Sequence, residues 1–120
     1  MPDSSQNLYK KLLGRKGEKL VLKYLKKQGC KILKKNYSTP FGEADIVVQD
    51  GEEIAFVEVK TRTSDAFGAP REAVGADKRR RYRQIVKFFW KEHGEEPNAR
   101  FDVAEVFEDG TIEYFKYAFR

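Results

Sequence analysis

The chain is 120 residues long, which is enough to build one hydrophobic core and too short for two domains. Hydrophobic residues make up 40% of it and charged residues 36%, a balance typical of a soluble globular protein rather than of a disordered one. The 24 Lys and Arg residues exceed the 19 Asp and Glu residues, and the net charge of +5 favours a polyanionic partner such as nucleic acid, although such an excess can also serve solubility alone.

We therefore expect a single domain over residues 1–120. Cys30 is the only cysteine, so no internal disulfide can form, and a buried structural thiol in a reducing compartment is expected. Because His93 is the only histidine, a conventional zinc site is disfavoured. The first residues carry no apolar leader, and no run approaches the roughly 18 apolar residues of a membrane span, so we expect a cytoplasmic protein with no membrane partner.

The first predicted element is a helix from Asn7 to Gln28, which follows a loose tail over residues 1–6. Apolar residues recur in it at helical spacing, and Gly29 ends the pattern as a C-cap. Gly14 and Gly17 are poor helix formers, so their presence inside the helix predicts that another backbone approaches closely there.

Glu18 lies on the border of the apolar stripe of that helix rather than in the middle of its polar face. From this position its carboxylate can reach a sheet packed under the helix, while the plainer alternative is an exposed helical glutamate. The next predicted element is a strand from Cys30 to Thr39, which Pro40 ends because proline cannot donate to a strand ladder.

Two further strands are predicted, from Glu43 to Gln49 and from Glu53 to Thr61. They flank the pair Asp50-Gly51, a strong hairpin signal because both positions tolerate positive φ. The stretches Asp-Ile-Val-Val and Ile-Ala-Phe-Val-Glu-Val are apolar on both faces, as in central strands of a sheet that is covered on both sides. Charged residues inside such strands therefore need an explanation.

The register of this hairpin decides which charged side chains meet. With a two-residue loop, Asp45 lies opposite Phe56 and diagonal to Glu58, whereas with a four-residue loop it lies directly opposite Glu58. Side chains alternate along strands, so either loop places Asp45, Glu58 and Lys60 on one face, within the roughly 5–8 Å Cβ spacing of cross-strand neighbours. A three-residue loop without a bulge would separate them.

Two neighbouring carboxylates resist joint ionisation unless a cation lies between them, and hard oxygen ligands select Mg²⁺ or Mn²⁺ rather than Zn²⁺. A lysine beside such an ion adds a fixed positive charge near a phosphoryl oxygen. Asp45, Glu58 and Lys60 are thus suited to metal-assisted hydrolysis of a phosphodiester. The alternative is an ordinary surface ion pair between a Lys and a Glu on one strand.

A polar loop from Thr61 to Pro70 follows the acidic strand. If the strand continues, Arg62 shares the face of Lys60 and is placed to hold a substrate backbone, whereas the alternative is a plain surface connection. Apolar spacing then predicts a second helix from Ala76 to His93, with Gly94 as its stop.

The first turns of this second helix carry five cations in six positions. Spare amides and cations at a helix N-terminus attract phosphate, and Lys78 points toward the sheet while Arg80 and Arg83 face outward. A solvated basic face is the alternative. The candidates for contacting nucleic acid are Arg62, Lys78, Arg80, Arg81 and Arg83, and Glu43 and Gln84 are accessory candidates of the site.

The last predicted elements form a second hairpin of two edge strands, from Arg100 to Glu108 and from Thr111 to Ala118, around Asp109-Gly110. Its aromatic residues are expected in the core. Asp102 either supports the acidic site from behind or, more simply, caps a strand end or forms an ion pair.

Taken together, these residues resemble the UPF0102, or YraN, family of small uncharacterised bacterial proteins, to which an endonuclease role is usually ascribed. The resemblance covers nearly the whole chain, and its motifs are specific in combination rather than singly. They are Gly17-Glu18, Asn36-Tyr37, Gly42-Glu43-Ala44-Asp45, Phe56-Val57-Glu58-Val59-Lys60-Thr61-Arg62, Phe67-Gly68, Lys78 and Phe101-Asp102-Val103.

That family is similar to the restriction-endonuclease-like, or PD-(D/E)xK, nucleases and, through its early helical glutamate, to archaeal Holliday-junction resolvases. The resemblance implies an α/β fold whose central mixed sheet of about five strands is flanked by an N-terminal helix and a helix after strand three. It implies that Asp45 and Glu58 bind metal, that Lys60 is the catalytic lysine and that Glu18 is an accessory metal-binding acid. Ala44 stands where the motif name has proline, a change that removes no ligand.

The resemblance further implies an endodeoxyribonuclease that uses Mg²⁺ or Mn²⁺ to cut DNA phosphodiester bonds, with branched DNA as the first substrate to test. A homodimer is one option, because resolving a symmetric junction takes two active sites. Two alternatives come from other classes of protein. A catalytically inactive accessory protein with a nuclease fold would bind nucleic acid without a metal ion, and a protein-interaction module with a basic helix would have no affinity for DNA.

Overall fold

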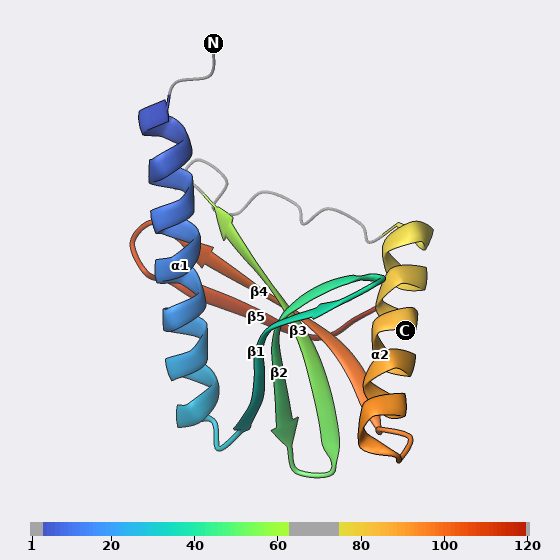
Figure 1. The fold of residues 1–120 in the computed structure, drawn as a ribbon. Coiled ribbons are helices and arrows are strands. Elements are labelled where there is room, and N and C mark those ends of the chain that lie inside the picture. Colours follow the sequence, from blue (N-terminus) through green and yellow to red (C-terminus); the bar gives the residue numbers. More distant parts are fainter. Residues whose placement is uncertain (1–3, 63–74, 120) are drawn as a thin grey trace.

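The computed structural model of the protein describes residues 4–62 and 75–119 (Figure 1). Its elements are, in chain order, α1 (Ser4–Lys27), β1 (Lys31–Thr39), β2 (Gly42–Asp50), β3 (Glu53–Arg62), α2 (Ala76–His93), β4 (Ala99–Phe107) and β5 (Ile112–Phe119). The predicted α/β architecture, a mixed five-stranded sheet with one helix before it and one after its third strand, is confirmed.

The five strands lie in one sheet in the order β1-β2-β3-β4-β5. Neighbours run antiparallel except β3 and β4, which are parallel. Parallel neighbours need a long crossover connection, and α2 lies in that connection. Because β4 pairs on both sides, the prediction that the last hairpin adds two edge strands is wrong for β4 and holds only for β5.

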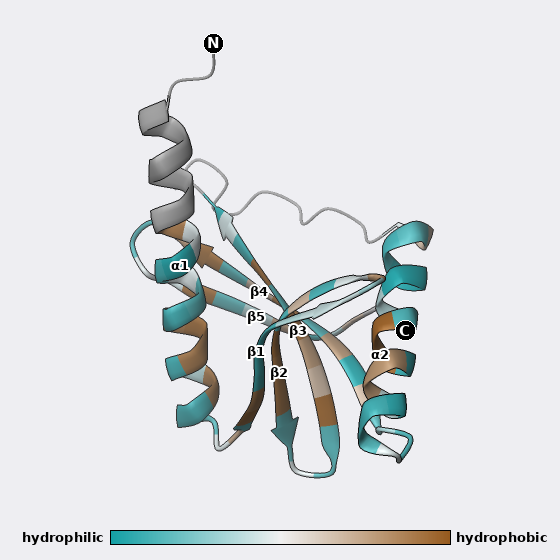
Figure 2. Ribbon diagram, in the orientation of Figure 1, coloured by the Kyte–Doolittle hydropathy of each residue, from teal (hydrophilic) through white to brown (hydrophobic). Residues whose placement is uncertain are grey.

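The two helices cover opposite faces of the sheet, so the core has two layers (Figure 1). On the α1 side, Val21 and Leu25 pack against alternate residues of β2, β3 and β4. On the α2 side, Tyr82, Ile85 and Phe89 pack against the residues in between. This double coverage explains why β2 and β3 are apolar on both faces, and Figure 2 shows brown residues in these central strands and teal ones on the outer sides of both helices.

The ends of the helices agree with the glycine signals in the sequence. Gly29 and Gly94 both have positive φ, and the Gly94 N–H donates to the Trp90 carbonyl at 2.8 Å, as expected for helix stops. At its other end α1 begins at Ser4, so the predicted loose tail is wrong for residues 4–6. Over the described residues, neither helix is long and apolar enough to cross a membrane.

Gly17 is closely approached, as predicted, but by side chains rather than by another backbone, and the predicted close approach is wrong at Gly14. A Cβ on Gly17 would lie 3.0 Å from Cγ2 of Thr61 in β3, whereas a Cβ on Gly14 would meet nothing within 4 Å. Cys30 is half-buried against the α1-side core rather than fully buried, and burial raises the pKa of its thiol. The predicted loop to Pro70 lies outside the described residues from residue 63 onward.

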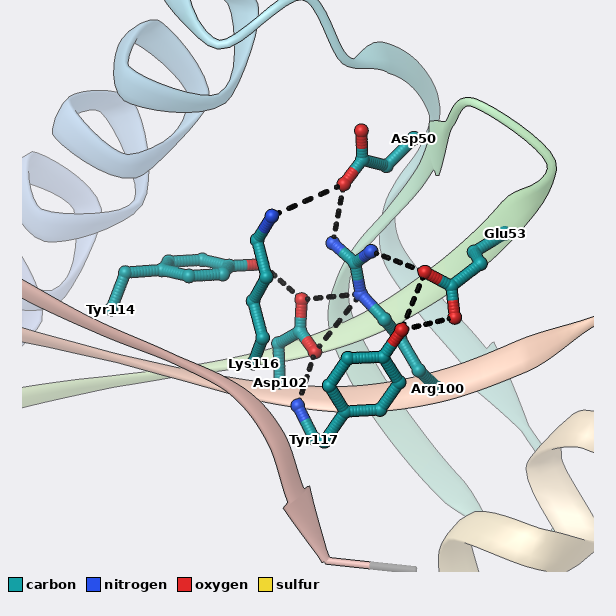
Figure 3. Close-up of polar contacts among 7 residues, drawn as sticks. All are labelled: Asp50, Glu53, Arg100, Asp102, Tyr114, Lys116 and Tyr117. Atoms are coloured by element: carbon teal, nitrogen blue, oxygen red, sulfur yellow. Dashed lines mark hydrogen bonds and ion pairs between the residues drawn. The ribbon is translucent and has the colours of Figure 1, made fainter.

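A buried arginine fixes the sheet under the last turn of α1 (Figure 3). The Arg100 side chain is 2% exposed and forms ion pairs with Asp50 at 2.8 Å, Glu53 at 3.1 Å and Asp102 at 3.1 Å. Asp102 also accepts hydrogen bonds from the Tyr114 hydroxyl at 2.6 Å and from the backbone of β5. One guanidinium therefore links the β2–β3 turn to β4, and the ion-pair reading of Asp102 is the one observed.

Replacing Arg100 by methionine tests this network. Arg100→Met keeps much of the apolar volume but leaves Asp102, which is 1% exposed, as an uncompensated buried charge, so we expect a loss of about 3–5 kcal/mol in unfolding free energy. The matched control is Lys116→Met, which removes a lysine 58% exposed and 3.6 Å from Asp50 and should change stability by less than about 1 kcal/mol. Urea denaturation measures both, and equal losses would contradict this account.

Candidate active site

The pairing of β2 with β3 brings two acids of the sequence motif to the same point. Ile46 lies opposite Val57, so one further step in this register would join Asp45 to Glu58. The observed register is the one expected for the four-residue loop, although Asp50 and Glu53 also pair, so the loop itself is only Gly51-Glu52. The paired ladder nevertheless ends at Ile46 and Val57 and does not include the two acids.

A side chain takes the place of the missing ladder bond. The Val59 N–H donates to Oδ2 of Asp45 at 2.8 Å, so this backbone group is satisfied by a carboxylate instead of a β2 carbonyl. Beyond this point β2 stays paired with β1 as far as Thr39 and Gly42, while β3 stays paired with β4 as far as Arg62. The sheet therefore divides at Asp45 into a β1–β2 arm and a β3–β4–β5 part.

The carboxylates around this division repel one another. Burial raises the pKa of Asp45, and the charges of Glu58 and Glu43 raise it further, against the hydrogen bond from Val59 and the charge of Lys78, which lower it. Burial also raises the pKa of Glu18 in α1, followed by the charges of Asp45 and Glu43. Such crowding of like charge in a partly buried place is typical of a functional site.

The first turn of α2 supplies the cation nearest to Glu58. Lys78 Nζ lies 2.6 Å from Oε1 and 2.5 Å from Oε2 of Glu58. Despite this short contact, the buried Oε2 accepts no hydrogen bond of normal geometry. The Tyr82 hydroxyl also hydrogen-bonds Glu58, and burial, then the charges of Glu58 and Asp45, raise the pKa of Tyr82, so it keeps its proton.

Lys60 and Arg62 follow Glu58 on the same face of β3, because strand side chains alternate. The β4 residue opposite Lys60 is Glu105, which is 6% exposed. Arg62 forms an ion pair with Glu105, Nη2 to Oε1, at 3.4 Å. The cation predicted to hold a substrate backbone is thus already engaged by a buried acid.

The remaining basic candidates lie farther along α2. Arg80 pairs with Asp77 at 3.5 Å on the exposed surface. Arg81 packs over the turn between β1 and β2, where a Cβ on Gly42 would come within 2.8 Å of its Cδ. Arg83 and Gln84 line two hollows on the outer part of α2, apart from the acids. The structure therefore brings Asp45, Glu58 and Lys78 together, with Glu18 and Glu43 near enough for their charges to act on one another and on Asp45. It sets Arg80, Arg83 and Gln84 apart.

Two residues of the site, Tyr82 and Glu105, are not among the candidates predicted from the sequence. Tyr82 belongs to the apolar spacing of α2, and its hydroxyl contact with Glu58 has no sequence signal beyond its place one turn after Lys78. Glu105 had a signal: it interrupts the apolar run Val-Ala-Glu-Val-Phe in β4, as Asp45 interrupts β2. A charged residue inside an apolar strand, the signal that singles out Asp45, thus also singles out Glu105.

The carboxylates of Asp45 and Glu58 fit a hard divalent cation that takes its remaining ligands from water or substrate. In the part of the chain that the structure describes, no three His, Cys, Asp or Glu side chains are grouped closely enough to hold a metal ion by themselves. Mg²⁺ is usually bound by one or two carboxylates together with water and substrate phosphate, and not by an all-protein cage. Asp45 and Glu58 meet that smaller requirement, with Lys78 as the present counter-ion of Glu58.

Comparison with known proteins gives the same family as the sequence motifs. Residues 17–106 match the model of "Uncharacterised protein family UPF0102". A UPF0102 protein of Thermodesulfovibrio yellowstonii is 42% identical over 107 residues, covering 89% of this chain and 95% of its own length. A UPF0102 protein of Alkaliphilus metalliredigens is 41% identical over 112 residues, covering 91% and 98%.

Among solved structures, the fold is similar to that of Archaeoglobus fulgidus Hjc, described as a Holliday junction resolvase from an archaeal hyperthermophile. The TM-score is 0.51 and the identity 22%, over 82% of this chain and 72% of that one. The expected restriction-endonuclease-like fold is therefore confirmed.

The raised pKa of Asp45 predicts that this acid lowers the stability of the fold. A carboxyl with a folded-state pKa above its ordinary 3.8 stabilises the protein while protonated, and this contribution is lost as pH rises through the folded value. Asp45→Asn removes the charge and keeps an acceptor for the Val59 N–H, so we expect the melting midpoint at about pH 7 to rise by a few degrees.

Thermal melts across pH check this expectation. The gain should shrink to nothing at low pH, where Asp45 is protonated in both states. Asp109→Asn is the control and should lower the melting midpoint at neutral pH. The hydrogen bond from the Thr111 N–H lowers the pKa of Asp109, so the charged form of this residue stabilises the fold. A midpoint that falls in Asp45→Asn at neutral pH would contradict the reading of this site.

Proposed function

The chain belongs to the UPF0102 family, and from this premise we propose that it is a metal-dependent endonuclease that hydrolyses DNA phosphodiester bonds, with branched DNA as its substrate. One observation carries the proposal: Asp45 and Glu58 converge where β2 leaves β3, beside Lys78 and Lys60. The likeness of the fold to a structure described as a Holliday junction resolvase supports the choice of branched DNA.

Asp45 and Glu58 would hold a Mg²⁺ or Mn²⁺ ion, and Glu18 would assist them from α1. When bound, such an ion supplies positive charge that polarises the phosphodiester and makes a water molecule more acidic. The acids are held for this task by their own contacts, Asp45 by the Val59 N–H and Glu58 by the Tyr82 hydroxyl.

The two lysines serve the phosphate from the same side of the sheet. Lys60 shares a face of β3 with Glu58, where its ammonium can orient the attacking water or neutralise charge that develops on the phosphate. Lys78 forms an ion pair with Glu58, and at the start of α2 it is also placed to contact a phosphate oxygen. Binding would therefore weaken with salt, as for other phosphate contacts.

Cleavage of labelled four-way, flapped, duplex and single-stranded DNA, with and without Mn²⁺, tests the proposal. We expect cleavage of the branched substrates that requires Mn²⁺ and falls at least about a hundredfold in Glu58→Gln and in Lys60→Met, because each removes charge that stabilises the transition state. The matched controls Glu52→Gln and Lys35→Met remove the same charges from exposed positions away from the site and should keep full activity.

Equal cleavage by wild type and Glu58→Gln would contradict the proposal and indicate a contaminating nuclease or a different site. DNA binding without cleavage by any form would favour the inactive accessory protein. Absence of DNA binding would favour the protein-interaction module.

The Lys78–Glu58 contact gives a separate prediction on metal affinity. A cation that binds Glu58 must displace an ammonium already held there at 2.5 Å, and a partly exposed ion pair of this kind is worth about 1 kcal/mol. Lys78→Met should therefore bind Mn²⁺ about fivefold more tightly than wild type in titration calorimetry, while Arg80→Met, which alters an exposed pair, should not. Weaker Mn²⁺ binding in Lys78→Met would show that Lys78 does not compete for Glu58.

A further inference from the structure

A hollow of about 360 Å³ lies beside α2, on the flank that faces the start of β4. We name it the Trp90 hollow. Its lining residues are Arg83, Val86, Lys87 and Trp90 from α2, with Glu96, Pro97, Ala99 and Phe101 from the segment that follows the helix. None of them belongs to the acidic site described above.

Trp90 is 41% exposed, although an indole is a large apolar group that gains much from burial. The core under α2 is completed without it, since Tyr82, Ile85 and Phe89 fill the inward face of the helix. An aromatic ring left at the rim of a hollow, and not needed for the core, is more typical of a contact surface than of packing.

Two cationic side chains lie beside the Trp90 ring on the surface of α2. Arg83, Lys87 and Trp90 are spaced four and three residues apart, so their side chains are neighbours on the helix surface. Neither Arg83 nor Lys87 forms an ion pair with another residue that the structure describes. The one acid in the lining is Glu96, so the rim keeps a positive excess.

A second, smaller hollow repeats this composition across the outer side of the helix. It measures about 220 Å³, shares Lys87 with the first, and is lined by Phe41, which is 44% exposed, together with Gln84, Phe88 and Lys91. Exposed rings thus alternate with cations around α2. Proteins that bind single-stranded nucleic acid use the same combination, in which cations contact the phosphates and bases stack on the rings.

We propose that the Trp90 hollow binds the unpaired bases of a single-stranded DNA arm, with Trp90 as the stacking ring and Arg83 and Lys87 on the flanking phosphates. This inference rests on the proposed nuclease function, because it names the part of the DNA substrate that α2 binds. A second copy of the chain fits the surface less well, since a two-fold contact would bring the same cations face to face.

The position of the hollow relative to the acids agrees with such an arm. Lys78, which contacts Glu58, and Trp90 lie on one rigid helix, twelve residues or about 18 Å apart along its axis. A branch with an unpaired arm on the helix would thus place duplex phosphates near the division of the sheet. The substrate favoured by this arrangement is a duplex with a single-stranded flap.

The test uses the intrinsic fluorescence of Trp90, which is the only tryptophan of the chain, so any change in emission arises at this site. Full-length Asp45→Asn protein in EDTA is titrated with short oligo(dT), and labelled oligo(dT) is followed by anisotropy. We expect saturable quenching, and an affinity about tenfold lower in Trp90→Ala but little changed in Trp90→Phe, because stacking needs a ring and not an indole. The double change Arg83→Glu with Lys87→Glu should abolish quenching.

The matched control is Lys31→Glu with Lys35→Glu, which makes the same charge change on exposed residues of β1 and should retain binding. Unchanged affinity in Trp90→Ala, equal loss in the control, tighter binding of oligo(rU), or emission that depends on protein concentration without DNA would each overturn the proposal. The quenching test involves neither metal nor cleavage. Quenching without cleavage would therefore contradict only the nuclease function, and cleavage without quenching would contradict only the role of the Trp90 hollow.

Discussion

The hydrogen bond from the Val59 amide to the Asp45 carboxylate is the contact on which the arrangement of this protein depends. A backbone N–H in a covered sheet must find an acceptor, and here an acidic side chain replaces the next carbonyl of the ladder. As a result β2 can leave β3 without an unsatisfied amide, and the carboxylate is fixed beside Glu58. The two helices then bring Glu18 and Lys78 to this point, because they cover opposite faces of the sheet (Figure 1).

Acids at the two ends of the paired stretch of β2 and β3 have opposite electrostatic environments. Near the β2–β3 turn, hydrogen bonds from Arg100 to Asp50 and from Tyr117 to Glu53 lower the pKa of both carboxyls, as expected for groups that hold a fold together (Figure 3). Farther along, burial and like charges raise the pKa of Asp45, with Lys78 as a partial counter-ion. The carboxylates around Arg100 are thus balanced by positive charge, whereas those around Asp45 carry more negative charge than Lys78 neutralises. A site for a cation needs such an excess of negative charge.

Much of the fold follows from local signals in the sequence. Helix α2 has the predicted limits, and the glycine stops and the double-sided strands follow from spacing and turn residues. The turn signal alone left two registers of β2 on β3 open, and the structure selects one of them. The placement of β4 inside the sheet did not follow from such signals, since a hairpin signal fixes pairing with β5 but carries no information on the parallel partner β3. For the site, alternation along strands brings Asp45 to Glu58, while the contacts of Lys78 with Glu58 and of Arg62 with Glu105 depend on tertiary packing that no single segment encodes.

The most direct measurement is a crystal structure of the protein soaked with Mn²⁺ and an uncleavable branched DNA, with anomalous data collected near the manganese edge. We expect an anomalous peak between the carboxylates of Asp45 and Glu58, with Lys78 Nζ moved from Glu58 toward a phosphate oxygen. A peak elsewhere in the molecule, with the Lys78–Glu58 ion pair intact, would contradict it.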